Sequence, residues 1–151
     1  SKDSTYAVSW FPADKRFLYT RDNGGNELYH LYLQDESGEQ KDLTPGEGHR
    51  ASFYGWSKDK QHFYVATNER DKSFVDIYRY AVDDLSREMW FRNPGGFDIA
   101  GISPTGRWII LNKSNTTVDN NLYLAEAHAS GIGGGRPATL SFAALPGGSP
   151  A

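Results

Sequence analysis

The sequence predicts an all-β protein, a β-propeller fragment of three four-stranded antiparallel blades. One phrase recurs three times, in which an apolar end leads through a polar turn into an alternating strand; the copies begin at Trp10, Trp56 and Ile102. These residues follow one another at intervals of 46 positions. A period of about 40 to 50 residues that divides into four short strands is typical of a propeller blade. A β-sandwich is the alternative, but it does not explain so regular a recurrence.

Composition also favours strands and restricts the classes of function. Aromatic residues make up 14% of the 151 residues, and aromatic side chains pack well on a pleated sheet. The formal net charge of -3 provides no basic field, so no nucleic-acid partner is expected. Cysteine is absent, which excludes a disulfide framework and thiolate chemistry.

The chain carries no pattern typical of membrane insertion. No apolar run approaches the roughly 18 residues that a spanning helix needs, so no membrane partner is expected. Residues 1–4 lack an apolar segment, and we therefore expect no signal peptide in this chain. A chain without cysteine suits a reducing or an oxidising compartment, which leaves both cytoplasm and periplasm open.

The first predicted blade covers residues 5–44, and turn residues separate its strands. The four strands are expected at residues 6–10, 16–20, 28–33 and 40–44. Pro12 presets the backbone of the first turn, and residues 22–26 form a second turn rich in Asn and Gly. The apolar third strand is expected to be buried on both faces. The polar fourth strand is expected at an outer edge.

The second and third blades repeat this order over residues 51–92 and 97–141. Their strands are expected at residues 51–56, 62–67, 76–80, 87–91, 97–102, 108–111, 122–124 and 136–141. The three blades make up one domain, residues 1–141. Residues 142–151 are rich in Ala, Gly, Ser and Pro, and they are expected to be a flexible tail or a segment foreign to the natural protein.

Two stretches carry a resemblance to a known family. Residues 104–107 lead into an aliphatic strand that is followed by Leu-Tyr in the next one, and residues 68–71 lead to the aromatic strand 76–80. These phrases resemble the propeller repeats of prolyl oligopeptidase-family serine peptidases and of Tol-type periplasmic propeller proteins. The resemblance covers roughly residues 5–124. It implies a propeller that caps a hydrolase domain, filters substrates by size and contributes to peptide binding.

None of that family's catalytic residues can be carried over to this chain. Its catalytic Ser, Asp and His belong to the hydrolase domain, and the G-x-S-x-G nucleophile elbow is absent from this sequence. Residues 101–106 look similar to the elbow, but Ser103 occupies the turn position of Phe11 and Ser57 in the other repeats. The resemblance implies a non-catalytic gating or substrate-binding segment. The enzyme question stays open, and any enzyme activity is expected to be that of a hydrolase.

Three blades leave two sheet faces uncovered, whereas closed propellers have at least about four blades. Large apolar side chains are expected on those faces: Phe17, Tyr19, Leu28, Leu31, Trp108, Ile110 and Leu122. Burying roughly six to ten such side chains contributes on the order of 10–30 kcal/mol. Association costs roughly 4–15 kcal/mol. We therefore expect a self-assembling homodimer that closes six blades, with a nine-blade trimer as a less favoured arrangement.

Ligand sites are expected at one mouth of the channel, on the loops between second and third strands and on the blade junctions. The candidate binding residues for a peptide or a small molecule are Asp22, Asn26, Glu27, Arg50, Glu69, Arg70, Asp71, Asp119 and Asn121. The simpler interpretation is that Asp and Asn are turn formers here. By the same interpretation, Arg70 and Asp71 form a surface ion pair within their loop.

His49, on a glycine-flanked loop, is the candidate general base, whereas His30 and His62 are expected to be structural. No histidine spacing typical of a metal site occurs, so no cofactor is expected. The alternative is Ca²⁺ or another divalent metal in the channel, held by carboxylate and amide oxygens of the mouth loops. It belongs to a second hypothesis, a small hydrolase of esters, lactones or phosphotriesters whose site forms in the channel of the oligomer.

Overall fold

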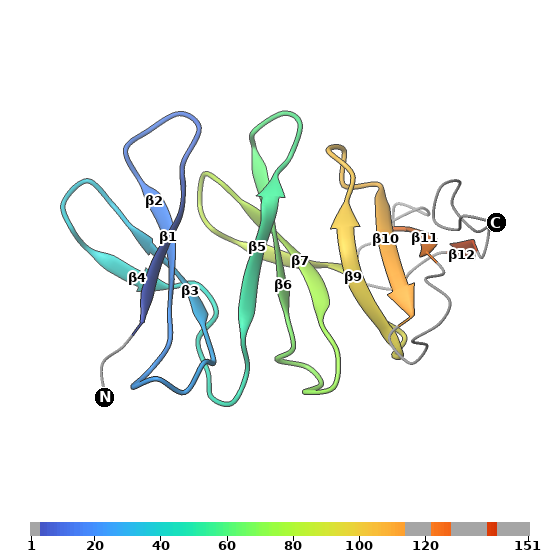
Figure 1. Cartoon of the computed structure of the whole chain (residues 1–151). Helices are drawn as coiled ribbons and strands as arrows, with labels where there is room; N and C mark the ends of the chain where they lie inside the picture. The colour runs from blue at the N-terminus through green and yellow to red at the C-terminus, as the bar shows by residue number, and fades with distance from the viewer. Residues whose placement is uncertain (1–3, 114–121, 128–138, 142–151) are drawn as a thin grey trace.

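The computed structural model describes residues 4–113, 122–127 and 139–141, and every regular element in these ranges is a β-strand. The strands form three four-stranded antiparallel sheets that follow one another in the order of the sequence (Figure 1). The predicted all-β class and the three antiparallel blades are therefore confirmed. The part of the chain described by the structure contains no helix that could cross a membrane.

In each sheet the strands pair in the order in which they follow one another in the sequence, and the sheets are named blades 1, 2 and 3. Blade 1 contains β1 (Thr5–Trp10), β2 (Phe17–Arg21), β3 (His30–Gln34) and β4 (Gln40–Asp42). Blade 2 contains β5 (Ala51–Trp56), β6 (His62–Thr67), β7 (Asp76–Ala81) and β8 (Arg87–Phe91). Blade 3 contains β9 (Phe97–Ile102), β10 (Trp108–Lys113), β11 (Leu122–Glu126) and β12 (Thr139–Ser141).

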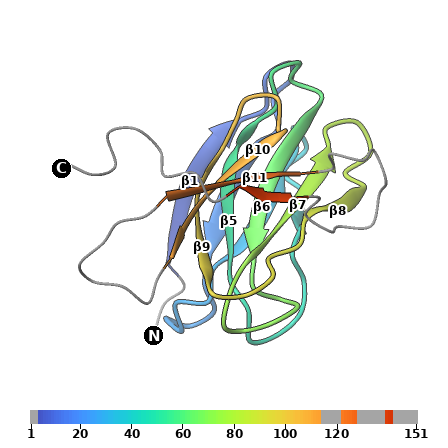
Figure 2. The ribbon, with the colours of Figure 1, turned by 90° about the vertical axis from the view of Figure 1, so that its right-hand side faces the viewer.

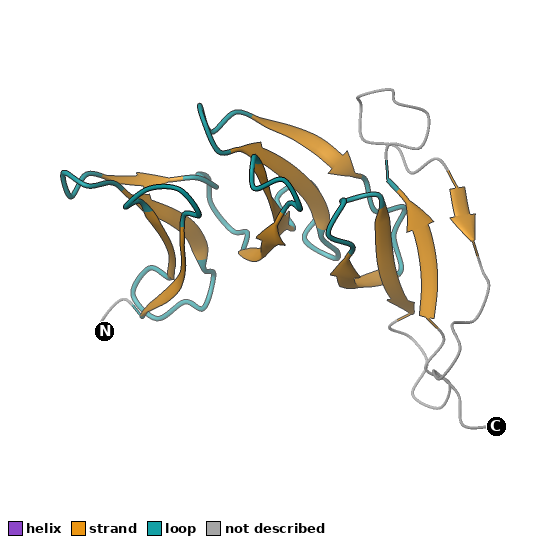
Figure 3. Ribbon diagram, turned by 90° about the horizontal axis from the view of Figure 1, so that it is seen from above, coloured by secondary structure: helices purple, strands orange, loops and turns teal. Residues whose placement is uncertain are grey.

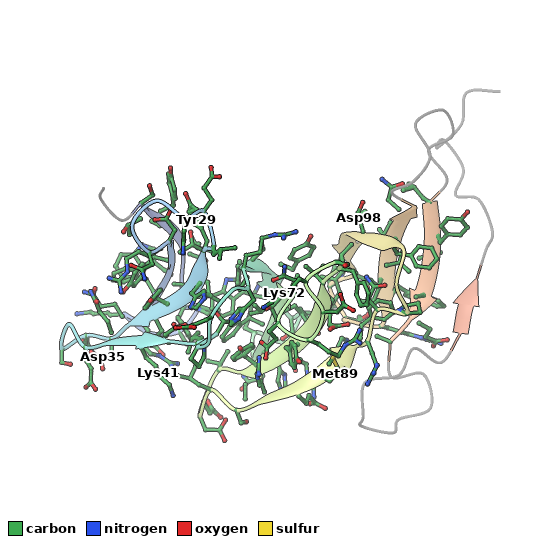
Figure 4. The ribbon with its side chains drawn as sticks, turned by 90° about the horizontal axis from the view of Figure 1, so that it is seen from below. Tyr29, Asp35, Lys41, Lys72, Met89 and Asp98 are labelled. Atoms are coloured by element: carbon green, nitrogen blue, oxygen red, sulfur yellow. The ribbon has the colours of Figure 1, made fainter. Side chains whose placement is uncertain are left out.

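The three blades stand face to face in a row. Seen from the β10 end, they lie one behind another (Figure 2), and from above they fan out along an arc (Figure 3). Lys41 on β4 and Met89 on β8 lie along one rim of the molecule, whereas Tyr29 and Asp98 lie along the opposite rim (Figure 4). The labelled residues thus place the fourth strands of blades 1 and 2 on one rim and β9, the first strand of blade 3, on the opposite rim, as in propeller blades.

The 46-residue repeat is visible in the first hairpin of every blade. The backbone N–H groups of Phe11, Ser57 and Ser103 each donate to a carbonyl five positions later, at 2.8 to 2.9 Å. The strand register also skips one residue at the same repeat position of each first strand, namely Val8, Tyr54 and Ala100. The recurring sequence phrase thus encodes one hairpin with one β-bulge, built three times.

Two apolar cores lie between the blades. The core between blades 1 and 2 contains Phe11, Leu18, Leu31, Leu33, Leu43, Ala51, Phe63, Val65, Tyr80 and Val82. The core between blades 2 and 3 contains Tyr64, Ala66, Ile77, Phe91, Phe97, Ile99, Ile109, Leu111, Ala125 and Ala127. Successive residues of β6 point alternately into one core and the other. Blade 2 is thus covered on both faces, whereas blades 1 and 3 each turn one face away from it.

Side-chain hydrogen bonds to backbone carbonyls tie neighbouring blades together at the edges of these cores. Tyr80 Oη donates to the carbonyl of Leu43 at 2.7 Å, and burial raises the pKa of Tyr80 to about 12. Trp90 Nε1 donates to the carbonyl of Gly106 at 2.6 Å. Because such bonds depend on direction, they fix how far each sheet slides along the next, which apolar contact alone leaves free.

The predictions for the third strand of blade 1 are wrong in two respects. The strand begins at His30 rather than at residue 28, and only Leu31 and Leu33 are buried while its other residues are half-buried. Blade 1 has a neighbouring sheet on only one face. Buried and half-buried residues therefore alternate along the strand. Leu31 also lies in the core between blades 1 and 2, and it does not belong to the uncovered face where it was expected. Residues 142–151 lie outside the described residues.

Candidate functional site

A cavity of about 470 Å³ opens at the loop edge of blade 1, the lower edge in Figure 1. The end of β2, the β2–β3 loop, β3 and the β4–β5 junction supply its walls. The charged and aromatic residues that line it are Arg21, Asp22, His30, Tyr32, Asp42 and Glu47. This is the edge at which the sequence predicts ligand-binding loops.

Asp22 supports the fold of this edge rather than offering a free carboxylate. It is 3% exposed, and its two oxygens accept the N–H groups of Ser4 at 2.7 Å and of Glu27 at 3.0 Å. The hydrogen bond from Ser4 is the main cause that lowers the pKa of Asp22. Asn68 holds the same repeat position in blade 2 and accepts the N–H of Arg50 at 2.8 Å. In both blades this side chain ties the end of the second strand to the start of the first.

The remaining predicted residues of blade 1 divide between the loop and a second hollow. Asn26 Oδ1 accepts the N–H groups of Asn23 at 3.2 Å and Leu28 at 3.0 Å, which closes the β2–β3 loop. Glu27 and Arg50 are exposed and line a hollow of about 310 Å³ between blades 1 and 2. The structure thus brings Glu27 and Arg50 to one surface, whereas Asn26 has a structural role.

His49, the predicted candidate for a general base, is buried in the junction between β4 and β5. His49 is 3% exposed, and its Nε2 lies 2.7 Å from the carbonyl oxygen of Thr44, which makes Nε2 the donor. Its ring stacks on the ring of His30 at 4.6 Å between centroids. Gly46 lets the junction fold over the ring, because a Cβ at Gly46 would lie 2.8 Å from His49 Cε1. Gly46 therefore lets the junction cover the imidazole instead of exposing it.

His30 is the histidine that reaches the cavity, and sequence reasoning missed it as a site residue. Its Nδ1 lies 2.8 Å from Asp42 Oδ2, while Asp42 Oδ1 accepts the N–H of Thr44 at 2.9 Å. When Nδ1 donates to the carboxylate, Nε2 carries the lone pair that a general base needs. The guanidinium of Arg21 lies over the Tyr32 ring at 4.4 Å in the same cavity. The alternation of β2 and β3 would have placed Arg21, His30 and Tyr32 on one face.

Arg70 pairs with Asp76, so the predicted ion pair between Arg70 and Asp71 is wrong. Arg70 donates through Nε and Nη2 to the two carboxylate oxygens of Asp76, at 2.8 Å each, and through Nη2 to the carbonyl of Asn93. Asp76 is fully buried and also accepts the N–H of Asn93 at 2.7 Å. A planar guanidinium matches a carboxylate through two parallel bonds. Asp71 instead accepts the N–H of Ser73 within its own turn.

Glu69 also has a partner within blade 2. Arg87 donates to both of its carboxylate oxygens at 2.8 Å, and this bonding lowers the pKa of Glu69. The guanidinium of Arg87 lies 4.1 Å from the centre of the Tyr78 ring. Asp119 and Asn121, the predicted binding residues of blade 3, lie outside the described residues. Over residues 4–113, 122–127 and 139–141, no group of three or more His, Asp or Glu side chains is placed to hold a metal ion.

Comparison with known proteins supports the propeller assignment. No family model matches the chain. Over 86 residues the chain is 36% identical to dipeptidyl aminopeptidase BIII of Pseudoxanthomonas mexicana, a match that covers 56% of this chain and 12% of that protein. The chain thus spans about an eighth of the length of this curated relative.

Two solved propeller structures are similar in fold. TolB from Acinetobacter baumannii matches 89% of this chain with a TM-score of 0.53 and 17% identity, over 31% of its own length. A putative TolB from Agrobacterium tumefaciens matches 82% of this chain with a TM-score of 0.55 and 23% identity, over 46% of its own length. Together with the peptidase match, these likenesses confirm the resemblance to propeller domains of the peptidase and Tol type.

We predict that the buried carboxylate of Asp76 is structurally essential and that the neighbouring Asp71 is not. Asp76→Ala strands the Arg70 guanidinium and the N–H of Asn93, and it should lower the free energy of unfolding by about 3–5 kcal/mol. Asp71→Ala removes one exposed turn bond and should cost less than about 1 kcal/mol. Urea unfolding followed by circular dichroism measures both variants. Equal losses for the two variants would contradict the assignment.

Proposed function

We propose that the chain is a non-catalytic propeller segment that works as a self-assembling binding scaffold, comparable to the gating and substrate-binding domain of a prolyl oligopeptidase-like peptidase. The observation that carries this proposal is that polar side chains at the loop edge of the blades are buried and hydrogen-bonded within the fold. Asp22, His49 and Asp76 are buried and bonded to backbone or side-chain partners. Groups fixed in this way stabilise loops that present a surface and are poorly placed to exchange protons with a substrate.

The cavity of blade 1 supports a binding role. It combines the Arg21 guanidinium and the Tyr32 ring with the exposed carboxylate of Glu47. Such a wall offers a donor for a carboxylate and an acceptor for an amine. The curated relative is by name a dipeptidyl aminopeptidase, so a peptide is the ligand class that we propose. The proposed assembled state is a homodimer of six blades, as the two outward-turned sheet faces favour, and the cavity then lies at the loop edge of a junction between the two copies.

A second candidate function rests on the pair formed by His30 and Asp42. A carboxylate that orients an imidazole beside a cavity is an arrangement typical of general-base catalysis. This candidate is a small hydrolase of esters, lactones or phosphotriesters, with its site at the channel mouth of the oligomer. His30 replaces His49 as its candidate base, because His49 is buried. The metal-dependent form of this candidate would draw carboxylate and amide oxygens from the mouth loops of both copies.

The scaffold proposal predicts the mass of the protein in solution. The chain of 16.9 kDa should elute from a sizing column with twice that mass by light scattering, because dimerisation covers both outward faces. Dilution should shift the mass towards that of a single chain. A single-chain mass at every concentration, together with cooperative unfolding, would contradict self-assembly.

The two candidate functions differ in their predictions for p-nitrophenyl acetate. We expect hydrolysis at the buffer rate for the wild-type protein, with or without EDTA. A rate above buffer that falls by about 100-fold or more in His30→Gln would establish the hydrolase instead. His62→Gln is the matched control, since His62 lies on β6 and outside the blade 1 cavity. Abolition of such a rate by EDTA would point to the metal-dependent form.

A further inference from the structure

The two junctions inside the chain use the same pair of blade faces. At the first junction, Leu18 of blade 1 packs with Phe63 and Val65 of blade 2. At the second, Tyr64 of blade 2, the repeat counterpart of Leu18, lies in one core with Ile109 of blade 3, the counterpart of Phe63. Each junction thus joins the forward face of one blade to the rear face of the blade that follows it.

The rear face of blade 1 is an aromatic surface turned away from the other two blades. It consists of Trp10, Phe17, Tyr19 and Tyr32, whose rings contact one another in series at centroid distances of 5.3, 5.9 and 5.4 Å. Trp10 is 66% exposed, and an apolar hollow of about 250 Å³ lies beside it. The counterpart of Trp10 in blade 2, Trp56, packs against the core that blade 1 covers. Trp10 therefore occupies a position that elsewhere in the chain meets a preceding blade.

The forward face of blade 3 carries three aliphatic side chains, with Trp108 at one end of β10. Ile109 and Leu111 of β10 point into the core with blade 2, so Ile110 points the other way. The strand register places Leu124 opposite Ile110, and it places Leu122 beside them on the same face. These three residues correspond to Leu18, Leu33 and Leu31, the residues through which blade 1 packs on blade 2. At the first junction, aliphatic side chains of this kind pack against the aromatic rear face of blade 2. The forward face of blade 3 is therefore suited to pack against the aromatic rear face of blade 1.

We propose that the forward face of blade 3 in one copy packs on the rear face of blade 1 in a second copy, and that this head-to-tail junction occurs twice around a two-fold axis. The inference rests on the self-assembly proposed above and names the surfaces that perform it. In this arrangement the junction between two copies has the same forward-to-rear packing as the two junctions within the chain. Pairing of rear face with rear face would leave both forward faces exposed to water.

Complementation between two variants tests this arrangement. Phe17→Glu places a charge on the rear face, and Leu124→Glu places one on the forward face; both positions are half-buried in the single chain. Each variant alone has no intact junction, and we expect the light-scattering mass of one chain. An equimolar mixture keeps one intact junction, and we expect the mass of two chains at a concentration about 100- to 10,000-fold above that at which the wild-type protein dimerises. Gln61→Glu, on an exposed hairpin, is the control and should remain dimeric.

Each other outcome has a definite meaning. If one variant alone remains dimeric, its altered face is not part of the interface. This result would contradict the head-to-tail arrangement but not self-assembly. If the mixture stays monomeric although circular dichroism shows both chains folded, the arrangement also falls. A monomeric wild-type protein would overturn the proposed function itself. Should Phe17→Glu fail to fold, Trp10→Ala tests the rear face without a new charge, and it should lower the dimer fraction.

Discussion

Apolar packing between successive sheets is the interaction on which this fold depends. A single four-stranded sheet has two faces, and alternation along each strand makes both of them apolar in blade 2, where β6 contributes to both cores. Such a sheet is stable only between two neighbours, so the blades come in a row. The same requirement makes the outward faces of blades 1 and 3 the most consequential surfaces of the molecule, because the row ends there.

The polar residues of the loops stabilise the blades and the segments that connect them. Asp22 and Asn68 perform the same closing function in successive blades, and Asp76 joins the β6–β7 loop to the segment that leads into blade 3. Side chains used in this way are not free to take part in catalysis. The pair of His30 and Asp42 stands apart, because it faces a cavity and its orientation suits proton transfer.

The repeat made the fold predictable, whereas the site depended on contacts that no local pattern encodes. Regular spacing and strand alternation are properties of the sequence, and they were sufficient to place the strands within a few residues. The burial of His49 depends on the path of a glycine-containing junction, and the pairing of Arg70 with Asp76 depends on where two loops meet in space. The predicted partner of Arg70 was Asp71, its neighbour in the sequence, whereas the ion pair forms with Asp76.

Hydroxyl-radical footprinting of Trp10 tests the central claim most directly, that a second copy covers the rear face of blade 1. Tyr6 is the internal reference, since it lies on the same strand, is 59% exposed, and pairs with Thr20 rather than with the rear-face residues. As concentration rises, we expect the oxidation of Trp10 to fall several-fold while that of Tyr6 stays constant. Equal oxidation of both residues at every concentration would contradict the account.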